Sequence, residues 1–374
     1  MVYILFLFII GEIVLTIYAF RIHFCMNKSK SYNLTKCIYD TKFLVVIPVH
    51  NEELQIEKVI KSIRKTNYPQ KLIDIIILND RCSDRTVEIA CKNNVKAYSI
   101  LNKENTKGAI LKTFCNQYKE TINKFDFLCI ADADNIFDEY FFAFGNREFK
   151  KGNKIVQGQI NNIQYKKNII SFFMTFFQQI ISTFMFYKYK LGKSVIIAGK
   201  GVLITPEVIG QIEWNEKILI EDVCFSFDAL LNNYTIHYCN NMKIRTKHPY
   251  TIADLWIQQR RWTSGQIQIM KKYNSYILDK NLSGVARSFI TCGYINIIVF
   301  CLNIISLLNP QICILIIISL YICIFFNSLI ILEKNAKYII SILIFPFILF
   351  CWNIIFMFSF FKPEKEWKQI KNKY

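Results

Sequence analysis

Short apolar runs alternate with stretches of helical spacing between residues 42 and 284, and this alternation restricts the chain to few folds. Strands that alternate with helices predict βαβ units, in which parallel strands are covered by helices on both faces. We therefore predict a doubly wound, mainly parallel α/β sheet. The predicted strands are residues 43–48, 73–78, 96–101 and 125–131, and the predicted helices between the first three are residues 52–65 and 84–92.

Carboxylates follow three of the predicted strands. Glu52 comes after the first strand, Asp80 after the second, and Asp132 and Asp134 after the strand at 125–131. Open α/β sheets bind ligands beyond the carboxyl ends of their strands, and carboxylate oxygens suit Mg²⁺ or Mn²⁺ that also contacts phosphates. Each loop alone is also explained by a residue that caps the next helix. Their coincidence favours a site for a nucleotide diphosphate and its metal.

Two further motifs lie downstream of this region. The segment 199–201, Gly-Lys-Gly, permits close approach of the backbone to a bound group, although an ordinary tight turn explains it almost as well. Glu221 and Asp222 come just before a predicted helix at 223–231. Acidic residues at that place also complement the helix dipole, so a structural role is the alternative.

Gln258, Arg261 and Trp262 lie in another stretch of helical spacing. Arg261 suits a pyrophosphate and Trp262 offers a flat ring to a sugar, whereas a basic amphipathic helix at a membrane surface is the alternative. These residues alone do not decide between the two interpretations. An aromatic stretch at 168–187 is expected to form a core helix, with a helix at the membrane interface as the alternative.

Apolar segments of membrane-spanning length flank the α/β region, at residues 2–20, 288–308, 312–332 and 338–361. A chain with 53% hydrophobic residues and a net charge of +18 is typical of a membrane protein with a basic cytoplasmic face. Basic residues from Arg21 onward place the N-terminus outside and the α/β region in the cytoplasm. We therefore predict an integral protein of the cell membrane, with membrane lipid as a partner.

The predicted organisation has four parts, which are a transmembrane helix at 1–21, the cytoplasmic α/β domain at 42–284, transmembrane or interfacial helices at 286–361, and a basic tail at 362–374. If all three C-terminal segments span the membrane, the basic tail ends outside, against the charge rule. The sequence therefore leaves open whether one of these segments is interfacial or re-entrant, or whether the tail is an exception to the rule.

Composition argues against several other classes of protein. The basic charge is not gathered in a block beside a recognisable nucleic-acid-binding module, so we predict no nucleic-acid partner. The thirteen cysteines are scattered and include no Cys-x-x-Cys pair, so neither a zinc site nor a disulfide framework is expected. We interpret them as reduced, small apolar residues.

Taken together, the motifs resemble those of membrane-embedded family 2 glycosyltransferases of the processive type, the group of cellulose, hyaluronan and poly-N-acetylglucosamine synthases. The resemblance covers residues 43 to 265 and implies a GT-A fold, which is a Rossmann-like α/β catalytic domain with a mainly parallel sheet, flanked by transmembrane helices. Asn79 and Ile220 depart from the family pattern, which usually has Asp and Thr at these places. The matching motifs are the segment 45–52, Asp80, Lys107-Gly108, Asp132-x-Asp134, Glu221-Asp222 and Gln258-x-x-Arg261-Trp262.

The resemblance implies a role for each matching residue. Asp222 is expected to be the catalytic base of an inverting transfer, and Asp134, assisted by Asp132, is expected to hold Mg²⁺ or Mn²⁺. Asp80 is expected to hold the uridine of the donor. The residues expected to bind substrate are Glu52, Asp80, Lys107, Asp132, Glu221, Gln258, Arg261 and Trp262.

We therefore expect transfer of a sugar from a UDP-sugar to a hydroxyl of a growing cell-surface polysaccharide. The resemblance favours UDP-N-acetylglucosamine first and UDP-glucose second. The small number of C-terminal spans favours the alternative, in which a single sugar is moved to a lipid-linked or other membrane acceptor. A non-enzymatic membrane scaffold is a third interpretation, and the intact carboxylates argue against it.

Overall fold

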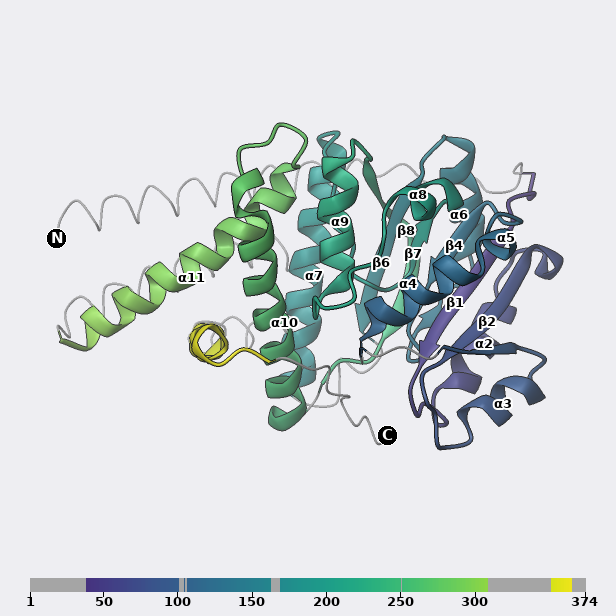
Figure 1. Cartoon of the computed structure of the whole chain (residues 1–374), viewed down its shortest axis with the longest axis horizontal. Helices are drawn as coiled ribbons and strands as arrows, with labels where there is room; N and C mark the ends of the chain where they lie inside the picture. Colours follow the sequence, from purple (N-terminus) through teal and green to yellow (C-terminus); the bar gives the residue numbers. More distant parts are fainter. Residues whose placement is uncertain are drawn as a thin grey trace.

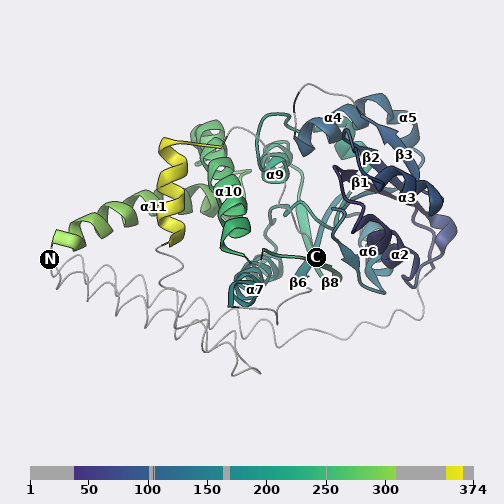
Figure 2. The ribbon, with the colours of Figure 1, turned by 90° about the horizontal axis from the view of Figure 1, so that it is seen from below.

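The computed structural model describes residues 38–100, 104, 106–162, 169–249, 251–308 and 351–364. An α/β body built on one sheet carries a group of longer helices at one end (Figures 1 and 2). The cysteines in these ranges are free thiols, as the sequence predicts.

The sheet consists of β1 (Phe43–Val49), β2 (Ile73–Asn79), β3 (Lys96–Ser99), β4 (Phe127–Ile130), β5 (Ile136–Phe137), β6 (Ile155–Asn162), β7 (Val202–Ile204) and β8 (Ile236–Thr246). Its strand order is β3-β2-β1-β4-β7-β6-β8-β5. The pairings among β1 to β4 and between β6 and β8 are parallel, whereas β7 pairs antiparallel with β4 and β6, and β5 with β8. The loops after β1, β2 and β4 therefore meet at one edge of the sheet.

Strand β1 is buried on both faces of the sheet. Successive side chains of a strand point to opposite faces, so Phe43, Val45 and Ile47 enter one core while Leu44 and Val46 enter the other. A parallel strand covered on both faces needs a continuous apolar run rather than an alternating one. This is why the run at 43–48 is readable from the sequence.

Shorter helices cover the two faces. Helices α2, α3 and α6 contribute to the core that contains Phe43, whereas α4, α8 and α9 contribute to the core that contains Leu44. In α2 the buried residues Ile56, Val59 and Ile63 recur at helical spacing and form one apolar stripe. The bounds are α2 (Ile56–Arg64), α3 (Thr86–Lys92), α4 (Lys107–Gln117), α5 (Lys119–Ile122), α6 (Phe141–Lys150), α8 (Pro206–Gln211) and α9 (Glu221–Leu231), with short 3₁₀ turns η1 (Gln70–Leu72) and η2 (Asn274–Tyr276).

The longer helices are α7 (Ile169–Lys190), α10 (Ile252–Tyr273), α11 (Gly284–Leu308) and a helix over residues 351–361. Helix α7 packs on β6 and β8, and α10 contacts both α9 and α11 (Figure 1). The helix at 351–361 joins this group, because the rings of Trp352 and Phe177 lie 4.8 Å apart and Ser359 Oγ lies 2.8 Å from Thr263 Oγ1. The C-terminal part of the chain is thereby attached to α7 and α10.

Most predicted elements are present, with shifted ends. Strands β1 to β4 correspond to the four predicted strands, and α7 and α11 cover the segments at 168–187 and 288–308. The helix predicted from residue 52 begins only at Ile56, because the chain first turns with the Glu52 carbonyl accepting hydrogen bonds from the amides of Gln55 and Ile56. Strands β5 to β8 were not predicted. They all lie after residue 131, where the last predicted strand ends.

Among the described residues, none of the helices combines the length and the apolar character needed to cross a membrane. The segments predicted at 1–21 and 312–332, most of the one at 338–361, and nearly all of the basic tail lie outside the described residues. The membrane assignment and the four-part organisation therefore stay predictions.

Candidate active site

A cavity of about 580 Å³ is lined by the loops at the carboxyl ends of β1, β2 and β4 and by residues of α9 and α10. The residues that the sequence singles out come from segments far apart along the chain, and they all line this cavity. They are Glu52, Asp80, Lys107, Asp132, Asp134, Glu221, Asp222, Gln258, Arg261 and Trp262. Their roles stay predictions, whereas their meeting in one cavity is a property of the fold.

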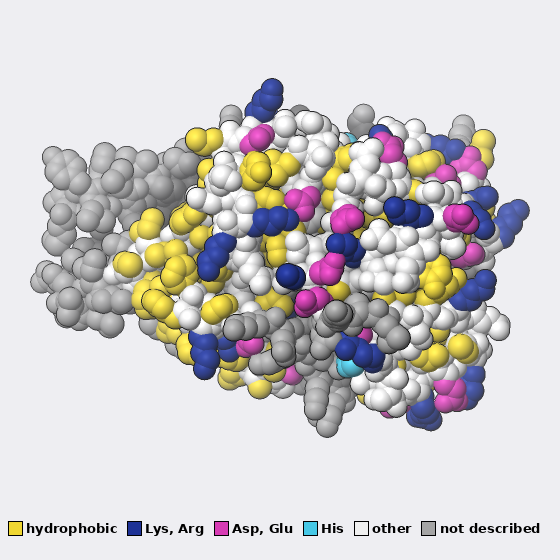
Figure 3. All heavy atoms as spheres, in the orientation of Figure 1, with side chains coloured by type: hydrophobic (Ala, Val, Ile, Leu, Met, Phe, Trp, Pro, Cys, Tyr) yellow, Lys and Arg dark blue, Asp and Glu magenta, His cyan; other side chains and the backbone are white. Residues whose placement is uncertain are grey.

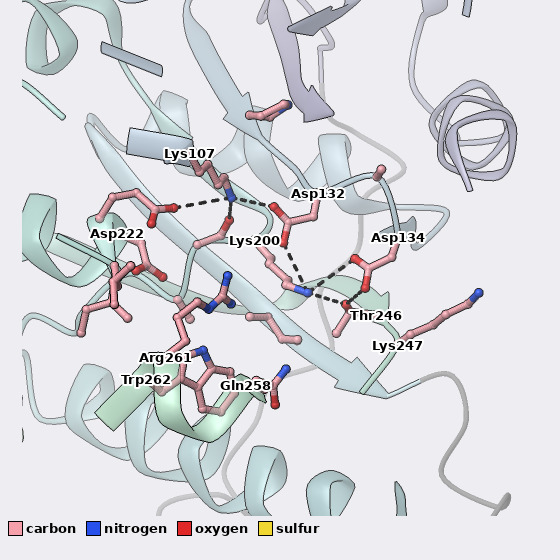
Figure 4. Close-up of a pocket in the computed structure, with 18 of the residues that line it drawn as sticks. Lys107, Asp132, Asp134, Lys200, Asp222, Thr246, Lys247, Gln258, Arg261 and Trp262 are labelled. Carbon is pink, nitrogen blue, oxygen red and sulfur yellow. Dashed lines mark hydrogen bonds and ion pairs between the residues drawn. The ribbon is translucent and has the colours of Figure 1, made fainter. Parts of the chain in front are cut away.

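Two carboxylates and two ammonium groups form the centre of the cavity (Figure 4). Lys107 Nζ donates to Asp132 Oδ1 at 2.6 Å. Lys200 Nζ lies 3.3 Å from Asp132 Oδ2 and 3.5 Å from Asp134 Oδ1. The hydroxyl of Thr246 accepts from Lys200 Nζ at 2.8 Å and donates to Asp134 Oδ2 at 3.0 Å. Asp132 therefore contacts both cations, and Asp134 contacts Lys200 directly and through Thr246.

The charges of this cluster stabilise one another. Burial acts to raise the pKa of Asp132, but the charges of Lys107 and Lys200 outweigh it and hold that pKa well below its usual range. Burial acts to lower the pKa of Lys107 and of Lys200, and the neighbouring carboxylates outweigh this effect and raise both pKa values. These three groups are therefore ionised at neutral pH.

Glu221 and Asp222 occupy the first turn of α9 and behave differently from Asp132. Burial and the charge of Asp222 raise the pKa of Glu221 to about 7. Burial also raises the pKa of Asp222, while Lys107 and Arg261 act against that rise. A buried carboxylate with a raised pKa in a cavity has the properties of a general base.

The loop at 199–201 connects the two groups of carboxylates. Its two glycines have φ values of 69° and 60°, a region that favours glycine. Lys107 Nζ donates to the Gly199 carbonyl at 2.9 Å, and a β-carbon added at Gly199 would lie 2.6 Å from Asp222 Oδ2. The buried side chain of Gln157 in β6 donates to the carbonyl of the loop's central residue at 2.9 Å. The backbone of the loop is therefore held in place beside Asp222.

Two further glycines allow the helices to approach the site closely. A β-carbon at Gly108 would lie 2.0 Å from the Asn215 carbonyl oxygen and 3.0 Å from Glu221 Cβ. A β-carbon at Gly265 in α10 would lie 2.7 Å from Ile220, the residue where the family pattern usually has Thr. Glycine at these two positions therefore brings α4 and α10 into contact with the start of α9.

The opposite end of the cavity is formed by the loops after β1 and β2. His50 Nδ1 lies 2.6 Å from the Asp80 carbonyl oxygen, and Arg81 Nη2 lies 2.8 Å from Asp80 Oδ1. The amide of Glu52 donates to Thr86 Oγ1 at 2.8 Å, which ties the first loop to the start of α3. Asp80 and Glu52 are thus held in place by contacts within and between these loops.

Helix α10 supplies Gln258, Arg261 and Trp262, which lie on the side of the cavity facing the central cluster (Figure 4). The charge of Arg261 reaches the acidic pair, since it acts to lower the pKa of both Glu221 and Asp222. Beyond Trp262 the wall becomes apolar, with contributions from α7, α11 and the helix at 351–361. Those apolar residues are Phe177, Ile181, Met185, Phe289 and Trp352.

Sequence reasoning missed three cavity residues. Lys200 was noted only as the residue between two glycines. Its place in this Gly-Lys-Gly segment was the one feature of the sequence that could have marked it as a residue of the site. Thr246 and His248 lie at and just beyond the end of β8, a strand that was not predicted. His248 is buried, its Nε2 has no hydrogen-bond partner within the described residues, and burial lowers its pKa to about 3, so its imidazole is neutral.

Comparison with known proteins links this geometry to a family. Residues 127–359 match the model of the family described as glycosyl transferase family group 2. The protein named "Probable glycosyltransferase YdaM" of Bacillus subtilis is 26% identical over 62% of this chain and 57% of its own length. A poly-beta-1,6-N-acetyl-D-glucosamine synthase of Staphylococcus epidermidis is 25% identical over 70% of this chain and 66% of its own length. The chain thus spans less than two thirds of the length of these relatives.

A solved structure of the mannosyltransferase PcManGT from Pyrobaculum calidifontis, in complex with GDP-Man and Mn²⁺, has a similar fold. It superposes with a TM-score of 0.62 at 12% identity and covers 96% of this chain and 98% of that chain. The prediction of a GT-A-like α/β fold is thereby confirmed. Because the family match covers more than half of the 374 residues, the protein belongs to the glycosyl transferase family group 2.

Proposed function

We propose that the protein transfers a sugar from a UDP-sugar to a hydroxyl of a growing cell-surface polysaccharide, with inversion and with the help of a divalent metal. UDP-N-acetylglucosamine is the favoured donor and UDP-glucose the second. The name of the Staphylococcus epidermidis relative, a poly-beta-1,6-N-acetyl-D-glucosamine synthase, supports this choice. The observation that carries the proposal is the meeting of Asp132 and Asp134 with Asp222 and Trp262 in one cavity.

The residues of the cavity fit a divalent metal that is shared with a diphosphate. No group of three acidic, histidine or cysteine side chains is assembled for a metal within the described ranges. Mg²⁺ is usually bound by one or two carboxylates together with substrate phosphates, and Asp132 and Asp134 supply such a pair. His248 Nε2, which is buried and has no hydrogen-bond partner among the described residues, is a further neutral nitrogen in the same cavity. A metal held here would neutralise charge that develops on the leaving diphosphate.

The protein's own groups then divide the remaining work. Asp222 accepts the proton of the acceptor hydroxyl while that oxygen bonds to the anomeric carbon and the bond from this carbon to the diphosphate breaks. Arg261 and Lys107 place positive charge where the diphosphate carries its negative charge. Trp262 offers its ring face to the acceptor sugar, and Asp80 lies where the uridine would bind.

The environment of Asp222 supports its assignment as the base. Because its pKa is raised, the carboxylate of Asp222 is a stronger base than that of an exposed aspartate. This favours proton transfer from the acceptor hydroxyl to Asp222. Asp132 is unsuited to this task, because the two lysines hold its pKa well below the usual range. Two tasks are thus assigned to two carboxylates whose pKa values shift in opposite directions. Asp132 helps to hold the leaving diphosphate, and Asp222 accepts the proton.

The decisive experiment is to incubate membranes that contain the protein with a panel of labelled nucleotide sugars and to determine the size of the product. The panel contains UDP-N-acetylglucosamine, UDP-glucose and, because PcManGT was solved with it, GDP-Man. We expect a long product from UDP-N-acetylglucosamine that disappears in excess chelator and returns with Mg²⁺ or Mn²⁺. Turnover that persists at full rate in chelator contradicts the metal assignment, and use of GDP-Man alone contradicts the proposed donor.

One observation favours a second candidate, which is transfer of a single sugar to a lipid-linked acceptor. The cavity continues beyond Trp262 into an apolar wall formed by Phe289 and Trp352 among others, and this surface suits the hydrocarbon of a lipid carrier. Product sizing separates the two candidates, because a lipid acceptor gives a product that is extracted by organic solvent and carries one added sugar.

We also propose that the chain is an integral protein of the cell membrane, with this cavity on the cytoplasmic side. The charge pattern of the sequence supports this proposal, as do the exposed apolar side chains of α11 and the helix at 351–361. Hydrophobic side chains are gathered over α11 in Figure 3. The expected outcome is that the protein stays in the membrane fraction after alkaline washing. Release into the wash contradicts the proposal.

A further inference from the structure

Lys200 holds an unusual position in the proposed metal site. Its ammonium lies within 3.5 Å of one oxygen of Asp132 and one of Asp134, the two carboxylates that would bind the metal. Thr246 extends the contact, since its hydroxyl bonds both to Lys200 and to the second oxygen of Asp134. Figure 4 shows the lysine between the two aspartates. One cation of the chain itself thus uses the oxygens that a metal needs.

A divalent metal and this ammonium cannot share those oxygens. Mg²⁺ binds carboxylate oxygens at about 2.0–2.1 Å, which would bring a doubly charged ion into the space that the Lys200 ammonium contacts. The repulsion between the two cations is strong in a buried site, because the effective dielectric constant is low there. Metal binding to Asp132 and Asp134 therefore requires the ammonium of Lys200 to leave.

The structure restricts which part of Lys200 can move. Hydrogen bonds hold the backbone of the loop on both sides, from Gln157 Nε2 to the Lys200 carbonyl at 2.9 Å and from the Gly201 amide to the Ile130 carbonyl at 3.0 Å. Movement of this backbone would also disturb the contact between Gly199 and Asp222. The side chain, in contrast, has a flexible four-carbon stem and can change rotamer. Displacement of the ammonium therefore leaves the site of the base intact.

Charge balance determines when this displacement is favourable. The two carboxylates are balanced by Lys107 and Lys200, so a metal that enters alone leaves the partly buried ammonium of Lys200 without these anionic partners. An unpaired buried charge is strongly unfavourable. The diphosphate of a nucleotide sugar supplies two negative charges at the same place and gives the ammonium new oxygen acceptors.

We propose that Lys200 is the resident cation of the Asp132–Asp134 pair, and that a divalent metal displaces its ammonium only together with a nucleoside diphosphate. This inference rests on the proposed function, since it assumes that the two aspartates are the metal site. Lys200 then acts as a positioning residue that makes metal binding depend on the donor. The displaced ammonium becomes a counter-charge for the diphosphate.

The test measures Mn²⁺ binding directly, by electron paramagnetic resonance of free Mn²⁺ with the purified full-length chain in detergent, with and without UDP. In the wild-type protein we expect UDP to tighten Mn²⁺ binding on the order of tenfold or more, a coupling of ordinary size for linked sites. In Lys200→Met, which removes the charge and keeps the apolar stem, we expect Mn²⁺ alone to bind about tenfold more tightly than in wild type. The effect of UDP on Mn²⁺ binding should shrink accordingly.

Lys112→Met is the matched control, because this lysine of α4 does not line the cavity and pairs with Glu213 and Glu216 instead. Mn²⁺ binding to it should keep the wild-type dependence on UDP. If Lys200→Met does not fold, Lys200→Gln provides the same measurement with a shorter polar side chain. Mn²⁺ binding without UDP that is equal to or weaker than wild type, in whichever variant folds, overturns the inference.

A third variant shows whether a negative result refutes only the role of Lys200 or also the metal site of the proposed function. Asp134→Asn removes one carboxylate and should weaken Mn²⁺ binding in the presence of UDP. If Asp134→Asn binds Mn²⁺ as wild type does, the metal site itself is wrongly assigned. If Asp134→Asn loses Mn²⁺ and Lys200→Met behaves as wild type, the metal site stands and only the role of Lys200 is refuted.

Discussion

Replacement of Asp222 by asparagine separates the chemistry of the site from its stability. Asparagine has nearly the same shape, and its side-chain oxygen can still accept from the Val223 amide, a contact of 2.9 Å in the native protein. It cannot accept the proton of an acceptor hydroxyl. We expect sugar transfer to fall by about 10²–10⁴-fold, which corresponds to about 3–5 kcal/mol of lost transition-state stabilisation.

The same substitution should not destabilise the fold. Burial raises the pKa of Asp222 above its ordinary value of 3.8. The stability that this group contributes is therefore present below pH 3.8 and is lost as the pH rises through the raised folded value. At pH 7.5 the folded protein must keep the Asp222 carboxylate ionised away from water, and a neutral asparagine carries no such charge. The melting temperature of the variant should therefore equal or exceed that of wild type. Activity and stability thus move in opposite directions.

The assay compares three proteins under identical conditions. Transfer is followed with the labelled donor that the panel identifies, UDP binding by calorimetry, and unfolding by circular dichroism. Asp74→Asn, at an exposed position in β2 outside the cavity, provides the control and should match wild type in all three measurements. Transfer by Asp222→Asn within threefold of wild type refutes the base assignment. A large fall in melting temperature refutes the account of its stability.

Three further expectations follow from contacts in the cavity. Glu221 has a pKa of about 7 in the folded protein against an ordinary value of 4.5, so its contribution to stability is lost as the pH rises from 4.5 through 7. In Glu221→Gln the melting temperature should therefore depend less on pH over this range. An unchanged slope contradicts this assignment. Gly199→Ala places a β-carbon 2.6 Å from Asp222 Oδ2 at a position with positive φ, so this variant should transfer sugar much more slowly. Gly210→Ala is the control, because a β-carbon there has nothing within 4 Å, and its transfer rate should be unchanged. Equal rates in the two variants would count against the close approach of Gly199 and Asp222. Lys107→Met removes one of the two ammonium groups that pair with the partly buried Asp132 and should cost about 1.5–3 kcal/mol of unfolding free energy. Lys112→Met in the same helix should cost less than about 1 kcal/mol, because the acidic partners of Lys112 are exposed. Similar losses in denaturant titrations would contradict the burial argument.

Residues that line the cavity could be picked out from the sequence where they directly follow, or lie within, a predicted element, and their roles stay predictions. Asp132 and Asp134 follow β4, whose apolar run is continuous, and Asp80 follows β2, which is apolar from Ile75 to Leu78. Such runs are expected where both faces of a sheet are covered. Glu221 and Asp222 begin a helix, and Arg261 and Trp262 lie within one. The spacing of such residues along the chain is set locally, so the sequence alone reveals it.

Residues positioned by long-range contacts could not be predicted in the same way. Thr246 is the last residue of β8 and His248 lies two residues beyond it, and β8 pairs with β6 from a segment about eighty residues earlier. Strand β8 has polar residues within it, so no apolar run marks it in the sequence. The functional meaning of Gly108 and Gly265 is likewise invisible locally, because it depends on how closely another part of the chain approaches them.

The sequence by itself determined the α/β class, the order of the carboxylate-bearing loops, and several of the residues that line the cavity. These properties depend on local periodicity and on the rule that parallel strands end at one edge of a sheet. Only the tertiary structure decided which charges compensate one another. Lys200 lies more than sixty residues from Asp132 and Asp134 along the chain, yet its ammonium contacts both. Electrostatic interaction depends on distance in space rather than along the chain, so this ion cluster and the opposite pKa shifts of Asp132 and Asp222 emerge only when the chain is folded.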